Sequence, residues 1–324
     1  MSRAVQDFLD LVTASLNGQG FRVDTLSNPR PLGELGGAWR CDLKSPEAAM
    51  PPSVVVKRSG PDWPWRWQDW SCQYFLSDLP GTRGLGPEFF AADEGMGWYL
   101  LEDLGLGTDL GLAIMRPDSR GRLAAGLMAC SLAGLHAGTF GRENVFGALR
   151  SRLPSIPPGR VEEQGVWRGA VEAALDGLRP GLAGELAPLL GELSAEMASP
   201  REFLCLTHGD WDANSVWYGD AGPRLMDFRR GGYRHALLDL AAWEWRCGAH
   251  AAAADSLWRE YKGELERLGA DRGGRFGEAH ARARAWIGLQ HLSEGERSPQ
   301  VQELLLRAAG QGDLAPLGGL AGLL

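Results

Sequence analysis

The chain has 324 residues, of which 44% are hydrophobic and 23% are charged, the composition of a folded protein with a sizeable core. Its net charge of −8 argues against nucleic acid as a partner. No apolar run reaches the length of a membrane span, so no membrane partner is predicted. The five cysteines are scattered and include no Cys-x-x-Cys pair, which predicts reduced thiols in a cytoplasmic protein.

The first predicted element is an amphipathic helix from Ala4 to Leu16, which an Asn-Gly pair ends. It lacks the basic start and the unbroken apolar core of a signal peptide. Residues 31–45 then contain a glycine-rich turn with Gly36 and Gly37, ahead of an alternating run that indicates a strand. Such a hairpin lets backbone amides approach phosphate groups, although a plain turn explains the same residues.

A strand and a helix come next. Ser53 to Lys57 is a short run of β-branched residues, which predicts a buried strand that ends at Lys57. The segment from Trp65 to Leu79 has helical spacing and places Asp69 on one face with Leu76. The tryptophans at 63, 65, 67 and 70 are explained either by packing against the sheet or by an exposed aromatic patch for an apolar ligand.

Two strands are predicted around a turn near Gly95, and the second is followed by Glu102-Asp103-Leu104-Gly105. Helices dominate the rest of the chain. His136, at the end of the first of them, is assigned a structural role, and the Gly-rich tail from Gly310 to Leu324 is predicted to be a loose apolar strap. The predicted helices span 121–137, 161–197 with a break near 180, 237–247, 251–268, 275–292 and 299–309.

The most informative stretch runs from Leu204 to Ala242. It predicts a strand, a loop that carries His208 and Asp210, a short strand from Ser215 to Tyr218, and a strand from Arg224 to Phe228 that contains Asp227. Two carboxylates near the ends of short strands suit phosphoryl transfer. One orients or deprotonates the attacking hydroxyl, and the other holds the metal that neutralises the triphosphate.

Three motifs carry a family resemblance: His-Gly-Asp at 208–210, Met-Asp-Phe at 226–228 and Leu-Leu-Asp-Leu-Ala at 237–241. In this order and spacing they resemble the aminoglycoside phosphotransferase and choline kinase superfamily, which shares the protein-kinase-like fold. The resemblance implies a bilobal α+β fold, with a small N-terminal β-sheet lobe over residues 1–104 and a larger, mainly helical C-terminal lobe over 105–324. It implies an ATP- and Mg²⁺-dependent phosphotransferase that acts on a hydroxyl of a small molecule.

The resemblance also implies roles for the residues of the C-terminal lobe. Asp210 is expected to act as the catalytic base, with His208 orienting its loop. Asp227 is expected to bind Mg²⁺. Asp239, at the start of a buried helix, is expected to tie down the catalytic loop.

In the N-terminal lobe, the resemblance implies that Lys57 contacts the α- and β-phosphates and pairs with Asp69. Gly36 and Gly37 are expected to cover the nucleotide. The hinge at Glu102 and Leu104 is expected to bind adenine through backbone groups. Together these expectations describe an ATP site between the two lobes.

Three features depart from the family pattern. Asp69 replaces a glutamate that is one methylene longer, so its helix would have to lie closer to the strand. The metal-side asparagine is expected at the position of Ser215, but an asparagine stands one residue earlier, at Asn214, so both residues stay candidates. Arg229 and Arg230 replace the acidic residues that commonly follow Met-Asp-Phe, which favours an anionic or neutral substrate or a pocket closed by salt bridges.

The first two departures, at Asp69 and at Asn214, support an alternative function, a nucleotide-binding scaffold or regulatory protein of the pseudokinase type that has lost transfer activity. Retention of Lys57, Asp210 and Asp227 favours the enzyme. The substrate itself does not follow from the sequence, because specificity resides in the variable helices of the C-terminal lobe.

Overall fold

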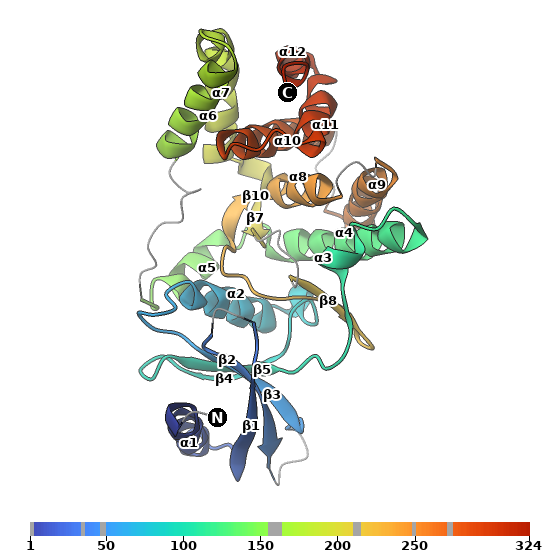
Figure 1. Ribbon diagram of the computed structural model, residues 1–324. Coiled ribbons are helices and arrows are strands. Elements are labelled where there is room, and N and C mark those ends of the chain that lie inside the picture. Colours follow the sequence, from blue (N-terminus) through green and yellow to red (C-terminus); the bar gives the residue numbers. More distant parts are fainter. Residues whose placement is uncertain are drawn as a thin grey trace.

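The structure is a computed structural model, and it describes residues 3–33, 36–45, 50–154, 164–209, 215–247, 251–270 and 275–324. Figure 1 shows an N-terminal sheet region at one end of the molecule and a larger helical region at the other. The predicted bilobal α+β fold is thereby confirmed.

The N-terminal sheet is antiparallel, with strand order β1-β2-β3-β5-β4. Because side chains alternate along a strand, the apolar residues of β3 serve both faces of the sheet. Val54 and Val56 face helix α1 (Arg3–Gly18), whereas Val55 faces the opposite side. The strands are β1 (Thr25–Pro31), β2 (Ala38–Lys44), β3 (Ser53–Arg58), β4 (Phe89–Asp93) and β5 (Trp98–Glu102).

Helix α2 (Arg66–Asp78) connects the two regions of the molecule. Its first turns bury Trp67 and Trp70 against the sheet, together with Val55 and Tyr99. Its later turns bury Phe75 and Leu76 in the core of the helical region. The packing interpretation of the tryptophans is therefore confirmed for these two indoles. A movement of α2 would have to disturb both cores.

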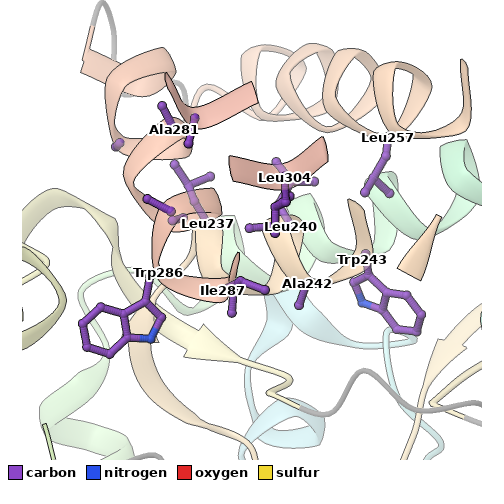
Figure 2. Packing of buried hydrophobic residues seen from close by; sticks show 14 of the residues in the cluster. Leu237, Leu240, Ala242, Trp243, Leu257, Ala281, Trp286, Ile287 and Leu304 are labelled. Atoms are coloured by element: carbon purple, nitrogen blue, oxygen red, sulfur yellow. The ribbon is translucent and has the colours of Figure 1, made fainter. Parts of the chain in front are cut away.

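The helical region packs around helices α4, α8, α10 and α11 (Figure 1). Figure 2 shows Leu237 and Leu240 of α8 beside Leu304 of α11 in this core. A side chain at Gly288 of α10 would lie 2.8 Å from Leu305, so glycine permits the close approach of α10 to α11. The helices are α3 (Leu110–Ala113), α4 (Ser119–Thr139), α5 (Glu143–Arg150), α6 (Gln164–Leu178), α7 (Leu182–Ala198), α8 (Leu237–Arg246), α9 (Ala251–Arg267), α10 (Phe276–Ser293), α11 (Pro299–Ala309) and α12 (Pro316–Ala321).

Two small sheets position the predicted catalytic stretch. One is a three-stranded sheet in the order β6-β8-β9, and the other pairs β7 with β10 in antiparallel register. Their strands are β6 (Thr108–Asp109), β7 (Leu204–Thr207), β8 (Val216–Gly219), β9 (Gly222–Leu225) and β10 (Gly232–His235). Ser215, directly before β8, and Met226, directly after β9, lie side by side, since Met226 N donates a 2.8 Å hydrogen bond to Ser215 O.

Three expectations from the sequence are corrected. The strand predicted from Arg224 to Phe228 ends at Leu225, because Asp227 has a left-handed backbone (φ 60°) that cannot continue a β ladder. Strand β10 was not predicted. The tail is no loose strap, because it forms α12 and buries Leu314 and Leu317 completely.

Among the described residues, no single helix is long and apolar enough to cross a membrane, and α4 with α5 would qualify only as a pair bent by 85°.

Candidate active site

The expected pair between strand β3 and helix α2 is present. Lys57 Nζ lies 2.5 Å from Asp69 Oδ2, and the two side chains are 11% and 1% exposed. The shorter acid therefore reaches the lysine, because α2 lies close to the sheet. The neighbouring residue Arg58 is exposed and stacks over Phe8 and Trp63, which leaves Lys57 as the inward-facing cation.

Tyr99 is a third member of this cluster that sequence reasoning missed. Its hydroxyl donates a 2.5 Å hydrogen bond to Asp69 Oδ2. Lys57 and Tyr99 are direct partners across β3 and β5, so their side chains share one face of the sheet. Burial, followed by the charge of Asp69, raises the pKa of Tyr99 well above its ordinary value, so the hydroxyl remains a donor. Strand alternation in the Trp98–Glu102 segment was the signal available in the sequence.

Asp69 also connects α2 to the loop that carries Asp227. Asp69 Oδ1 accepts a 2.8 Å hydrogen bond from Phe228 N. Burial by itself would raise the pKa of Asp69, but the charge of Lys57 and the hydrogen bonds from Lys57, Tyr99 and Phe228 outweigh burial and lower it. The carboxylate is therefore ionised at neutral pH, with hydrogen bonds at both oxygens.

The glycine-rich hairpin lies against the start of α2. Gly36 and Gly37 have φ angles of 69° and 66°, which side chains rarely adopt. A side chain at Gly37 would come within 2.9 Å of the Trp63 ring, and Arg66 donates a 2.6 Å hydrogen bond to Gly36 O. The hairpin backbone is thus held from α2, although residues 34 and 35 at its tip lie outside the described part of the chain.

The hinge after β5 is fixed by Asp103. Its carboxylate lies 2.8 Å from Arg40 Nη2 and accepts hydrogen bonds from Ser53 Oγ at 2.6 Å and Gly105 N at 3.1 Å. The backbone N–H of Glu102 donates a hydrogen bond to Glu88 O, directly before β4. Leu104 is half-buried between these anchored residues. The turn that is expected to present backbone groups to adenine is therefore rigidly held.

The start of the predicted catalytic loop is anchored by Asp239. Its two carboxylate oxygens accept hydrogen bonds from His208 N at 2.6 Å and Gly209 N at 2.9 Å. His136 Nε2 lies 3.2 Å from the same carboxylate, and its Nδ1 lies 2.7 Å from the Tyr261 hydroxyl. Burial would raise the pKa of Asp239, but these contacts lower it. The structural roles predicted for Asp239 and His136 are confirmed by this network.

His208 connects this loop to the segment before Asp227. Its side chain is buried, and Nε2 lies 2.7 Å from Met226 O. A carbonyl oxygen can only accept a hydrogen bond, so Nε2 carries the proton. This contact fits a residue that orients the loop. Asp210 and Asn214 lie outside the described residues, so their predicted roles are not tested.

Asp227 and Ser215 lie at the ends of two paired strands. The Asp227 side chain is 44% exposed, and its Oδ2 lies 3.9 Å from Arg229 Nε. Ser215 is buried beside Met226, one residue before Asp227. Because Asn214 is not described, the alternatives Asn214 and Ser215 stay open.

The residues present offer the donors that Mg²⁺ prefers. The described residues contain no group of three or more His, Cys, Asp or Glu side chains that could hold a metal without a substrate. Magnesium, however, binds one or two carboxylates and takes its other oxygens from phosphate and water. The accessible carboxylate of Asp227 fits that requirement.

A cavity among the described residues lies away from this site. It has a volume of about 260 Å³ and is lined by residues that include Glu196, Glu202, Phe203 and Arg275. Phe203 precedes β7, whereas His208 follows it, so this cavity opens at the opposite end of the strand from the catalytic loop. It is not part of the site that Lys57 and Asp227 define.

Comparison with solved structures shows the same fold. The choline kinase from Cryptosporidium parvum Iowa II superposes with a TM-score of 0.52 at 10% identity, covering 96% of this chain and 92% of that chain. The gentamicin complex of APH(2")-IIa gives 0.50 at 11% identity, covering 93% and 96%. The choline kinase LicA from Streptococcus pneumoniae gives 0.49 at 12%, covering 93% and 99%. No family model and no curated protein matches the sequence. The resemblance to choline kinases and aminoglycoside phosphotransferases is therefore confirmed as a similarity of fold.

Proposed function

We propose that this chain is an ATP- and Mg²⁺-dependent phosphotransferase that acts on a hydroxyl group of a small molecule in the cytoplasm. The observation that carries the proposal is the connection from Lys57 through Asp69 to Phe228 N. This connection couples the inward-facing lysine to the residue that follows Asp227. A fold supports many functions, so the proposal rests on these residues, and the small-molecule kinases of similar fold only add to it.

Each residue has a role in the proposed reaction. Lys57, held by Asp69, binds the α- and β-phosphates, while the Gly36–Gly37 backbone covers them and the hinge at Glu102 and Leu104 binds adenine. We place the lobe boundary at this hinge, with residues 1–104 on one side of the nucleotide and 105–324 on the other.

In the transfer step, the acceptor hydroxyl oxygen forms a bond to the γ-phosphorus as the bond between that phosphorus and the β-phosphate oxygen breaks. The products are a phosphate ester and ADP. Asp210 orients the hydroxyl and accepts its proton. Asp227, with Asn214 or Ser215, would hold Mg²⁺, which would neutralise charge on the phosphates. His208 holds the loop through its contact with Met226 O.

Two departures from the family pattern favoured the alternative, a nucleotide-binding protein without transfer activity. One of them no longer favours it. The shorter acid at position 69 was one departure from the family pattern, but its pair with Lys57 is present at 2.5 Å. The displaced asparagine is the remaining departure. The test of the proposed function therefore also has to distinguish it from this alternative.

The test compares two variants in a transfer assay with labelled ATP and a panel of hydroxyl compounds. Asp210→Asn is expected to retain nucleotide binding and to lose about 10²- to 10⁴-fold in transfer rate. Asp227→Asn is expected to weaken the Mg²⁺ dependence of nucleotide binding. Wild-type turnover in Asp210→Asn would contradict the base assignment, and nucleotide binding without any transfer in the wild type would favour the alternative.

A further inference from the structure

The loop that follows Asp227 concentrates positive charge in a chain whose net charge is −8. It carries Arg229 and Arg230, and Arg234 lies on the adjoining strand β10. We define these three residues as the arginine cluster. Its position next to both the catalytic loop and the metal-side aspartate makes its charge relevant to whatever molecule approaches the reacting hydroxyl.

Arg234 holds the cluster against the catalytic loop. Its Nη2 donates a hydrogen bond to Arg230 O, and its Nε donates to Thr207 Oγ1 at 3.1 Å. Gly209 has a φ of 70°, and any side chain there would collide with Arg234 Nη2 and Arg230 O. Gly209 is the residue directly before Asp210. The guanidinium of Arg234 therefore lies against the residue that precedes the predicted base in the sequence.

Two cations of the cluster lack a neutralising partner within the described part of the chain. The acceptors of the Arg234 guanidinium are a hydroxyl and a carbonyl, neither of which carries charge. Arg230 is exposed, and none of the described carboxylates forms an ion pair with it. Arg229 differs, because its Nε lies 3.9 Å from Asp227 Oδ2. Among the described residues, the salt-bridge interpretation thus applies to Arg229 and not to the other two.

A second element adds a cation to the same loop. Gln68 of α2 donates from Nε2 to Gly231 O at 2.5 Å and accepts from Arg150 Nε at 3.2 Å. Arg150 is the last residue of α5. Arg234 of β10 therefore contacts the loop after Asp227 directly, and Arg150 of α5 is linked to the same loop through Gln68.

We infer that the acceptor substrate carries an anionic oxygen group, a carboxylate or a phosphate, beside the hydroxyl that is phosphorylated. This inference rests on the proposed function and specifies its substrate class. Arg230 and Arg234 bind the anionic group beside Gly209, because an arginine fork matches the planar geometry of carboxylate and phosphate oxygens. A cationic acceptor such as choline or gentamicin would meet like charges at this position, which disfavours binding.

The test is thermal unfolding with Mg²⁺ and a non-hydrolysable ATP analogue, in the presence of matched acceptors. Gluconate is compared with glucose, glycerol 3-phosphate with glycerol, and choline serves as the cation. At least one anionic compound is expected to stabilise the wild type more than its neutral counterpart, and to do so less at high salt. A response to gluconate alone identifies a carboxylate, and a response to glycerol 3-phosphate alone identifies a phosphate.

Variants of Arg230 separate a binding role from general electrostatics. Arg230→Glu is expected to weaken the affinity for the anionic acceptor about tenfold, which corresponds to about 1.4 kcal/mol. Arg230→Lys is expected to keep most of the affinity because it keeps the charge. Arg122→Glu, an equal charge reversal on the exposed surface of α4, is the matched control and is expected to behave as the wild type.

Two results overturn the inference. One is stabilisation by choline or by a neutral compound without a larger effect of any anionic compound. The other is equal affinity of Arg230→Glu and wild type for the anionic acceptor. If the ATP analogue itself fails to stabilise the protein, the proposed function falls and this inference falls with it. If the analogue stabilises and the anionic compounds do not, only this inference falls.

Discussion

Replacement of Asp69 by asparagine tests the buried connection between the strand lysine and the Asp227 loop. The carboxylate is 1% exposed and accepts hydrogen bonds from Lys57, Tyr99 and Phe228 N. Removal of one partner of a buried ion pair typically costs 3–5 kcal/mol, because the other charge is left uncompensated. Lys57 is 11% exposed and can turn partly to water, so we expect a loss near the lower end, about 3 kcal/mol.

The assay is urea unfolding of wild type and Asp69→Asn at pH 7, with Asp42→Asn as a control. Asp42 pairs with Arg30 on the same sheet, but its side chain is 45% exposed, so the control is expected to change stability by less than about 0.5 kcal/mol. A double-mutant cycle with Lys57→Met is expected to show that the two losses are not additive. If Asp69→Asn unfolded with the same free energy as the control, the buried pair would not hold this site together.

The same variant makes a prediction about pH. The folded-state pKa of Asp69 is lowered, so its contribution is fully present above the ordinary aspartate value of about 3.9 and is lost as the pH falls through the folded-state value. The stability difference between wild type and Asp69→Asn should therefore be constant from about pH 5 to 8 and shrink below about pH 4. A difference that stayed constant down to pH 3 would contradict the ionised carboxylate.

Three further substitutions test the loop and the tail by urea unfolding. Gly209→Ala is expected to destabilise by about 1–3 kcal/mol and to lower transfer, because φ is 70° and Arg234 occupies the side-chain space; wild-type behaviour would contradict the crowding. Asp239→Asn is expected to cost about 2–3 kcal/mol through weakened hydrogen bonds to the loop, and an unchanged His208 environment by NMR would contradict its anchoring role. Leu317→Ala is expected to cost about 2–5 kcal/mol, because the side chain is fully buried; a neutral result would indicate a loosely attached tail.

Much of the fold and part of the site could be predicted from the sequence, since local signals agreed with the tertiary structure. Pro299 at the first turn and the following apolar spacing placed α11 at the bounds observed, Pro299–Ala309. The β-branched run before Lys57 predicted β3 and the inward lysine, and helical spacing placed Asp69 on the correct face of α2. At these positions, the periodicity of apolar residues and the family motif were sufficient to predict the structure.

The rest depended on contacts between distant segments. The hydrogen bond from Phe228 N to Asp69 joins residues 159 positions apart, and no local pattern predicts it. The tail contains so many glycines that its propensity favours a loop, but tertiary packing of Leu314 and Leu317 overrides that preference. Strand β10 carries three polar or glycine positions, so its pairing with β7 could not be predicted from apolar alternation.

Binding of Mg-ATP is the measurement that tests the central claim most directly. A ligand at about one hundred times its dissociation constant stabilises a protein by about 2.7 kcal/mol, which for a chain of this length raises Tm by about 4 °C. We expect this shift for the wild type with Mg-ATP, a smaller shift when Mg²⁺ is omitted, and little shift in Lys57→Met. If the folded wild type showed no shift at millimolar Mg-ATP, neither phosphoryl transfer nor nucleotide binding could be the function of this site.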